Sequence, residues 1–220
     1  MSQHPDEEGS KVPGLSKGRL EALTDGIFAT VMTVLVLTLS VPVIAGTLTG
    51  SQLTQDLNSA LQALLPNVLS YAMSFLLLAV MWISHHSVFH YIKTLDRPMI
   101  WLNILFLLSI GLVPFSTALL GRYPLEQLAV IIYGVNVVGI SISMLAFLSY
   151  GVRSGSITLD LPGATIIKTI IGRWRLGSLI YSSAVLISFV DTELSVIIYV
   201  LALCFYVISS SIGFKPLIRS

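Results

Sequence analysis

Ionisable side chains stand at the start of the first long apolar segment of the chain, residues 18–43. Arg19, Glu21 and Asp25 all fall near the beginning of this segment. A charged group inside a membrane-spanning helix is costly, so it marks a functional or structural site. Such groups either relay protons or make the polar contacts that hold neighbouring helices together. We therefore expect polar chemistry beside this end of the segment.

Candidate partners for Arg19 and Asp25 come from the next two apolar segments. They are Trp82, His85, His86, His90 and Asn103. A carboxylate such as Asp25, held against imidazole and guanidinium groups, would give a tight polar cluster. In the alternative, Arg19 extends to lipid phosphates and the histidines lie with the tryptophan at the membrane interface. The sequence leaves both arrangements open.

The histidines do not form a convincing metal site. His86 and His90 have the four-residue spacing of metal ligands on a helix, but the whole chain contains only four histidines. The adjacent pair His85 and His86 cannot point the same way on a helix. The sequence also lacks the H-E-x-x-H, G-x-S-x-G and glycine-rich phosphate-binding motifs. We predict neither a metal nor another cofactor, and no enzymatic activity.

Hydroxyl and aliphatic side chains share one face of the first apolar segment at helical spacing. They are Thr30, Thr33, Val34, Leu37 and Val41. In an ion pore, rings of hydroxyls replace part of the hydration shell of an ion, and a ring of valine or leucine gates by dewetting. In the alternative, the threonines bond to carbonyls one turn earlier and pack against neighbouring helices. Spacing alone does not decide between a pore and a packing face.

The composition is that of an integral membrane protein. Hydrophobic residues make up 55% of the 220 residues and charged residues only 10%, and the mean hydropathy is +0.88. These values exclude an ordinary soluble domain. Residues 1–17 are polar and do not resemble a signal peptide, so we expect the first apolar segment to stay in the mature protein. The lone Cys204 forms no intrachain disulfide, and a net charge of +1 gives no reason to expect a nucleic-acid partner.

Six membrane-spanning helices are predicted from the apolar segments. Their approximate ranges are 20–43, 61–91, 98–120, 126–150, 176–190 and 194–213. Pro114 should bend the third span, with Ser116 or Thr117 bonding to the freed backbone groups. Residues 46–58 are predicted to be a polar loop. Residues 151–175 are predicted to be a connection broken by glycine and proline, part of which lies along the membrane surface.

The basic residues indicate the orientation in the membrane. With six spans, eleven of the twelve lysines and arginines fall on one side, and only Arg122 falls on the other. The positive-inside rule then places both termini in the cytoplasm. The predicted organisation is a flexible N-terminal segment of residues 1–17, a membrane domain of residues 18–214 and a short C-terminal tail of residues 215–220.

The order of these motifs resembles the transmembrane protein 175 family, the lysosomal potassium channels and their prokaryotic homologues. The matching residues are Arg19 with Asp25-Gly26 in the first span, Trp82 with His85-His86 in the second, and Asn103 with Pro114-Phe115-Ser116-Thr117 in the third. The resemblance covers nearly the whole chain. It implies a homotetramer of six-helix subunits whose first helices line a central pore, in a prokaryotic cell membrane.

The resemblance also implies roles for individual residues. The narrowest ring of the pore would fall on Thr30, with further layers at Thr33 or Val34 and at Leu37. Family members usually carry isoleucine or leucine at the first ring, so Thr30 departs from the pattern and the seal moves to Val34 or Leu37. A second group would hold the helices together without touching the ion: Arg19, Asp25, Trp82, His85, His86 and Asn103.

The sequence thus predicts an all-α membrane protein that conducts potassium in preference to other monovalent cations. The main alternative is a proton-coupled transporter or proton-conducting protein in which Asp25 and the His85/His86 pair titrate. Transporters often contain inverted repeats with broken helices in both halves, and no repeat of the first-span motif is evident here, which favours the channel. A third hypothesis is an assembly protein without conductance.

Overall fold

The computed structural model describes residues 16–44, 49–157 and 163–213, with the side chains of the last helix described as far as Ile208. In this part of the chain the regular elements are helices. They are α1 (Lys17–Val34), the 3-10 helix η2 (Leu35–Thr38), α2 (Ser51–Ala63), α3 (Leu65–Phe89), α4 (Arg97–Gly111), α5 (Val113–Arg122), α6 (Gln127–Arg153), α7 (Gly163–Ile187) and α8 (Thr192–Gly213). Most of the predicted N-terminal segment and the whole C-terminal tail lie outside the described residues.

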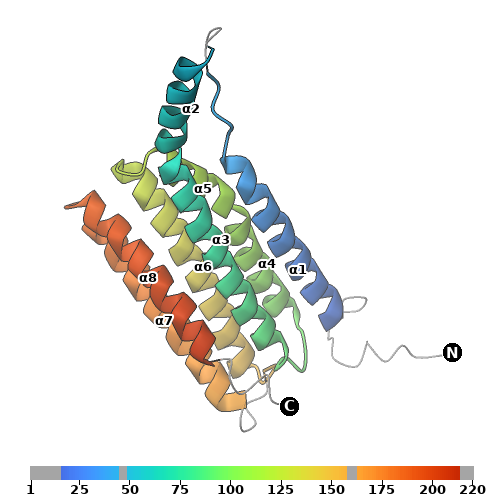
Figure 1. Ribbon diagram of the computed structural model, residues 1–220. Coiled ribbons are helices and arrows are strands. Elements are labelled where there is room, and N and C mark those ends of the chain that lie inside the picture. Colours follow the sequence, from blue (N-terminus) through green and yellow to red (C-terminus); the bar gives the residue numbers. More distant parts are fainter. Residues whose placement is uncertain (1–15, 45–48, 158–162, 214–220) are drawn as a thin grey trace, which may run out of the picture.

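The helices form one elongated bundle with nearly aligned axes (Figure 1). α3 and α6 run through its middle, and α4 and α5 follow one another along one side. α1 lies on one flank, α7 and α8 pair on the opposite flank, and α2 projects beyond one end. Large buried side chains fill the interior, among them Phe28, Phe89, Phe106, Phe147 and Tyr133. The core therefore lies along the whole length of the bundle.

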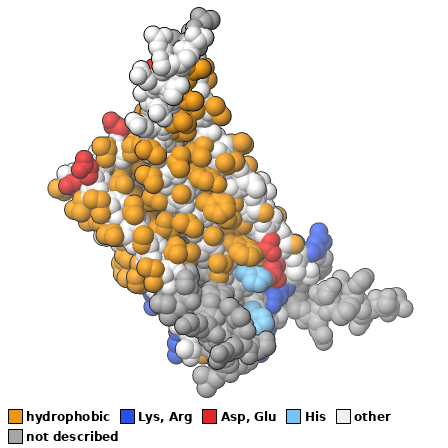
Figure 2. Space-filling model, viewed as in Figure 1, with side chains coloured by type: hydrophobic (Ala, Val, Ile, Leu, Met, Phe, Trp, Pro, Cys, Tyr) orange, Lys and Arg blue, Asp and Glu red, His pale blue; other side chains and the backbone are white. Residues whose placement is uncertain are grey.

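Four stretches of the described chain are long and apolar enough to cross a membrane. They are Lys17–Thr38, Leu65–Phe89, Arg97–Arg122 and Gln127–Arg153, and a shorter apolar helix covers Thr192–Ile208. The visible face of the bundle is covered by hydrophobic side chains, with charged groups near its ends (Figure 2). The prediction of a multi-pass, all-α integral membrane protein is thereby confirmed.

Two segments that were predicted to be irregular are helical. Within the predicted loop of residues 46–58, α2 begins at Ser51, directly after Gly50, which has a positive φ of 64°. The predicted connection of residues 151–175 contains the first half of α7, which begins at Gly163 and continues through Gly172. Packing outweighs the weak helix propensity of glycine here, because Ile167, Ile170 and Trp174 bury one face of α7.

Pro114 coincides with a break in the third predicted span. α4 ends at Gly111 and α5 begins at Val113, so the proline occupies the first turn of α5, where a missing N–H costs little. Ser116 donates a hydrogen bond to the carbonyl of Val113 at 3.1 Å. Thr117 instead donates to the hydroxyl of Ser74 on α3 at 2.7 Å. One of the two hydroxyls bonds locally, and the other ties α5 to α3.

Glycines allow α6, α7 and α8 to pack closely. A Cβ at Gly134 of α6 would overlap the hydroxyl of Tyr199 on α8, and one at Gly177 of α7 would overlap the hydroxyl of Tyr206. Each tyrosine donates a hydrogen bond to a carbonyl across the contact, Tyr199 to Val130 at 3.1 Å and Tyr206 to Arg173 at 2.6 Å. These contacts fix the two C-terminal helices against the bundle.

Candidate functional site

One face of α1 packs against the bundle. Its buried residues Leu20, Thr24, Phe28 and Val31 recur every three or four positions, and Leu35 continues the series at the start of η2. This spacing is that of a single stripe along a helix. The side chain of Phe28 contacts the ring of Phe106 on α4, with a centroid separation of 6.0 Å. The remaining circumference of α1 points away from the subunit's own core.

The predicted pore residues lie on that outward surface. Thr30 and Thr33 are exposed, Val34 is 40% exposed and Leu37 is 77% exposed. Val41, further along the chain, is also exposed. In contrast, Val31 and Leu35 belong to the buried stripe that faces the bundle. The structure thus places the four predicted residues on the exposed surface of α1 and η2.

The threonine hydroxyls on α1 bond partly to their own helix. Thr33 Oγ1 donates to the carbonyl of Ala29 at 3.0 Å and lies 2.8 Å from that of Thr30. Thr38 Oγ1 donates to the carbonyl of Leu35 at 2.8 Å, within η2. A hydroxyl that gives its proton to the backbone still presents lone pairs outward. Thr33 can therefore accept from water or contact a cation, but it is not a free donor.

A buried polar chain connects α1, α4 and α3. Thr24 Oγ1 donates to the carbonyl of Leu20 at 3.0 Å and accepts from Asn103 Nδ2 at 3.1 Å. Asn103 Oδ1 lies 2.9 Å from Nε2 of His85. The hydroxyl proton of Thr24 is donated to Leu20, so Thr24 can only accept a hydrogen bond from Asn103. The NH2 group of Asn103 therefore faces Thr24, and its oxygen faces His85. His85 Nε2 therefore carries a proton and donates it to Asn103.

Aromatic rings surround His85. Phe106 stacks on the imidazole at a centroid separation of 5.3 Å, Phe89 lies at 4.5 Å and Phe147 at 6.2 Å. The side chains of His85, Asn103 and Thr24 are each 2% exposed or less. A buried polar group costs free energy unless it is hydrogen-bonded, so this chain of bonds specifies the contact between the three helices.

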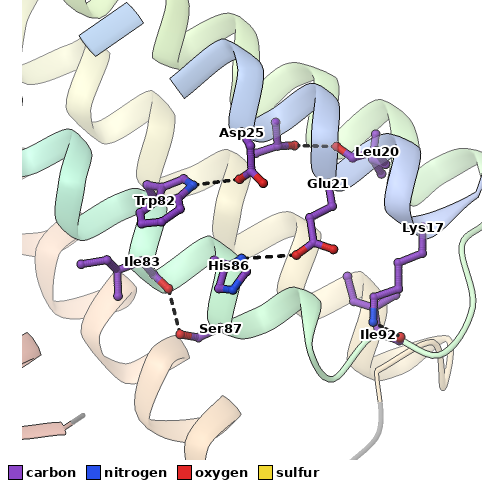
Figure 3. A network of polar contacts seen from close by, with 10 residues as sticks. Lys17, Leu20, Glu21, Asp25, Trp82, Ile83, His86, Ser87 and Ile92 are labelled. Atoms are coloured by element: carbon purple, nitrogen blue, oxygen red, sulfur yellow. Dashed lines mark hydrogen bonds and ion pairs between the residues drawn. The ribbon is translucent and has the colours of Figure 1, made fainter. Parts of the chain in front are cut away.

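A second polar network joins the outer surfaces of α1 and α3 (Figure 3). Trp82 Nε1 donates to Asp25 Oδ1 at 2.8 Å. One turn nearer the start of α1, Glu21 Oε1 lies 3.3 Å from Nδ1 of His86, and the rings of Trp82 and His86 stack at 5.7 Å. Lys17, another turn earlier, donates to the carbonyl of Ile92 at 3.1 Å. Three side-chain contacts, one on each successive turn of α1, thus attach α1 to α3 and to the residues that follow α3.

The two networks place the predicted polar residues in pairs rather than in one cluster. Asp25 contacts Trp82, whereas His85 contacts Asn103 in the buried chain. Arg19 lies on an exposed part of α1, where its backbone N–H donates to the N-cap Ser16 at 3.3 Å. No group of three or more histidine, cysteine, aspartate or glutamate side chains arranged to hold a metal occurs in the described part of the chain.

Comparison with known proteins identifies the family. The family model described as endosomal/lysosomal potassium channel TMEM175 matches residues 19–114. A potassium channel of Streptomyces collinus is 33% identical over 196 residues, which cover 86% of this chain and 90% of that protein. This chain belongs to the TMEM175 family. A potassium channel of Chamaesiphon minutus is a second TMEM175 relative, 31% identical over 195 residues that cover 86% of this chain and 92% of that protein.

A solved structure supports the same TMEM175 assignment. The crystal structure of a lysosomal potassium-selective channel TMEM175 homologue from Chamaesiphon minutus matches this chain with a TM-score of 0.73 and 28% identity, covering 88% of this chain and 97% of that one. The resemblance inferred from the motifs is therefore confirmed. These relatives are ion channels, so the prediction that this TMEM175 chain is not an enzyme is also confirmed.

Sequence reasoning missed two residues within the region matched by the TMEM175 family model. Thr24 received no role, although it is the α1 end of the buried chain, and Glu21 was assigned no partner. A signal was present for Glu21. Lys17, Glu21 and Asp25 recur every four residues on α1, and Trp82 and His86 have the same spacing on α3. Two such series can pair as rungs between adjacent helices.

Proposed function

We propose that four copies of this chain assemble into a passive, potassium-preferring cation channel whose pore is lined by α1. The observation that carries the proposal is the outward placement of Thr30, Thr33, Val34 and Leu37 on an apolar helix whose other face is buried. A helix that crosses a membrane and exposes hydroxyls at regular spacing gains most when those hydroxyls face water or ions. We propose potassium as the permeating ion because the relatives from Streptomyces collinus and Chamaesiphon minutus are potassium channels.

Within the described residues, the core between α1 and the rest of a single subunit leaves no such path, because aromatic and aliphatic side chains such as Phe28 and Phe106 fill it. α1 is the most peripheral of the four apolar spans: 28% of its most apolar window is buried, compared with 50% for α6. The exposed surface of α1 also carries the small residues Ala22, Gly26 and Ala29, and small residues let membrane helices approach closely. A pore between copies of α1 fits these features.

Along the pore, hydroxyl and aliphatic layers would alternate. Rings of Thr30 and Thr33 oxygens would replace part of the hydration shell of a permeating cation. Rings of Val34 and Leu37 would form the hydrophobic constriction, which closes by excluding water. In this arrangement Thr30, where a bulky residue is usual in the family, contributes to ion contact, and the seal lies deeper. Conduction needs no cofactor beyond the permeant ion.

The two polar networks hold α1 in place and do not touch the ion. Asp25 and Trp82 join α1 to α3 on the outside, and Thr24 joins it to Asn103 inside. The buried His85 belongs to a different network from Asp25, and His86, which shares the outer network with Asp25, pairs with Glu21. Neither of these histidine contacts involves Asp25, which disfavours the proton-coupled alternative. The names of the potassium channel relatives favour the channel as well.

In the membrane, α7 and α8 would complete six spans per subunit. The ends of the helices with Lys17, Arg97, Arg153 and Lys168 would then face the cytoplasm, as the positive-inside rule requires. The opposite end, which carries Asp56, Glu126, Asp191 and Glu193, would face outward. We propose the cell membrane of a prokaryote as the location, with both termini in the cytoplasm.

The proposal is tested by ion flux from liposomes that contain the purified full-length protein. Potassium and sodium gradients are compared, and proton uptake is recorded in parallel. We expect potassium flux that exceeds sodium flux and that falls strongly in Thr33→Trp and Leu37→Trp, because bulky rings obstruct the axis. Leu179→Trp, at a leucine of α7 that is 69% exposed, is the matched control and should conduct normally. Flux that occurs only in fixed proportion to proton exchange would replace the channel with a transporter.

A further inference from the structure

A cavity of about 240 Å³ lies between α3, α6, α7 and α8, on the flank of the bundle away from α1. Along α3 its lining extends from Leu77 to Ser87. The eleven residues of this stretch rise about 15 Å along the helix, half of the roughly 30 Å thickness of the hydrocarbon core. The cavity therefore spans about one leaflet of the membrane.

The lining favours hydrocarbon over water. Most of it is aliphatic or aromatic, including Met81, Val137 and Tyr181. Three lining hydroxyls already donate to carbonyls of their own helices: Ser87 to Ile83 at 2.8 Å, Ser141 to Val137 at 3.0 Å and Thr169 to Thr165 at 2.9 Å. These three hydroxyls present only acceptor lone pairs to the cavity, and its mainly apolar lining suits a hydrocarbon chain.

One charged side chain, Arg173, lies in the wall of the cavity, midway between the lining residues Thr165 and Tyr181 of α7. Arg173 is the only charged residue in the lining among the described residues, and it stands in the first half of α7, on the side of the bundle that carries most of the lysines and arginines. Arg173 is half-buried and has other contacts within the protein, and the several donors of a guanidinium lie in a plane suited to binding a phosphate in addition. The leaflet on the basic side of a membrane protein is also the one that is rich in anionic lipids.

From these features we propose that the cavity binds one acyl chain of an anionic phospholipid, with Arg173 contacting the headgroup phosphate. The head lies beside Arg173, and the tail extends from there along the apolar lining toward Leu77 and Tyr181. This binding site is separate from the proposed pore, and its occupancy is measured without reference to ion conduction.

The position of the site couples it to α1. Trp174, in the cavity wall, donates to Ser84 Oγ at 3.0 Å. Its ring contacts Phe106 edge-on at 6.3 Å, and Phe106 contacts Phe28 of α1 at 6.0 Å. A bound chain would hold Trp174 in this position and so support the packing of α1. The lipid would act as a stabilising ligand of the folded subunit.

The test is native mass spectrometry of the full-length protein released from vesicles of phosphatidylglycerol and phosphatidylcholine with identical acyl chains. We expect retained phosphatidylglycerol in preference to phosphatidylcholine. Thr169→Trp should abolish retention because the indole occupies the cavity at an exposed lining position. Ser183→Trp is the control, since Ser183 is also exposed on α7, also bonds to its own helix and does not line the cavity.

A second pair of variants tests the headgroup contact. Arg173→Gln should reduce the preference for phosphatidylglycerol by roughly fivefold, the effect of one basic residue near an anionic lipid. Arg175→Gln, two residues away and outside the lining, should leave the preference unchanged. Retention that is equal for both lipids and unaffected by Thr169→Trp would overturn the site. Equal losses in the two arginine variants, or displacement of the phospholipid by added oleate, would overturn the anionic phospholipid as its occupant.

Discussion

The side-chain amide of Asn103 on α4 donates a hydrogen bond to the hydroxyl of Thr24 on α1 over 3.1 Å, and both side chains are buried. This bond fixes the rotation of α1 about its own axis, because Thr24 can meet Asn103 only when the opposite face of α1 points outward. The same rotation leaves Thr30 and Thr33 exposed. A buried contact between two polar residues thereby determines which residues can line a pore.

Loss of the Asn103 amide should destabilise the subunit. In Asn103→Leu, His85 and Thr24 each lose a buried partner, at a cost of about 1–3 kcal/mol for an unsatisfied group. We expect a lower thermal unfolding midpoint for the purified full-length protein in detergent. Thr24→Ser keeps the hydroxyl and should unfold near the wild-type temperature. An unchanged midpoint in Asn103→Leu would show that the buried chain contributes nothing to stability.

Asp25 should matter for assembly but not for conduction. Asp25→Asn removes the charge and retains an oxygen that accepts from Trp82, so we expect potassium flux close to that of the wild type. Asp25→Leu removes the acceptor as well and should lower both the unfolding midpoint and the yield of assembled protein. The measurements are liposome flux and size-exclusion chromatography. If Asp25→Asn assembles normally but abolishes flux, then the carboxylate takes part in transport.

Helical periodicity separates the face with Thr30 and Thr33 from the face with Val31 and Leu35, but spacing alone did not decide which of the two faces packs against the bundle. The sequence also did not predict how the polar residues pair. Spacing places Asp25, Trp82 and His85 at the same end of two helices, but the pairing depends on how α1 and α3 are rotated relative to each other. That rotation is decided by three-dimensional packing, including the stacking of Phe106 on His85.

The errors in the fold prediction have a similar origin. α2 is rich in glutamine and serine, so its segment has the composition of a loop, although Leu53, Leu57 and Leu61 recur at helical spacing. In α7, Gly163 and Gly172 were interpreted as breaks. A glycine in a helix costs about 1 kcal/mol, and burial of a side chain such as Trp174 offsets that cost. Tertiary contacts, which the sequence does not show, outweighed the low helix propensity of these residues.

Close packing of α7 against α8 should make Gly177 intolerant of substitution. Gly177→Ala places a methyl group against the Tyr206 hydroxyl, and overpacking of this kind costs about 1–3 kcal/mol. We expect a lower unfolding midpoint than in the wild type. Gly172→Ala on the same helix is the control, because nothing lies within 4 Å of the added carbon and helix propensity favours alanine. Similar midpoints for the two variants would contradict the close contact.

The hydroxyl of Thr30 should promote potassium passage, and the side chain of Leu37 should oppose it. Thr30→Val preserves shape and removes the oxygen. If loss of the oxygen raises the barrier to ion permeation by roughly 1 kcal/mol, the potassium flux should fall about fivefold.

Leu37→Thr places hydroxyls in the proposed hydrophobic constriction and should increase the potassium flux, because a hydroxyl-lined constriction is wetted more easily. Ser183→Val removes an exposed hydroxyl from α7, outside the proposed pore, and should leave the potassium flux unchanged. Liposome flux with equal amounts of reconstituted protein measures all three. If Thr30→Val conducts as fast as the wild type while Leu37→Thr still increases flux, Thr30 does not contact the ion and the pore is controlled at Leu37 alone.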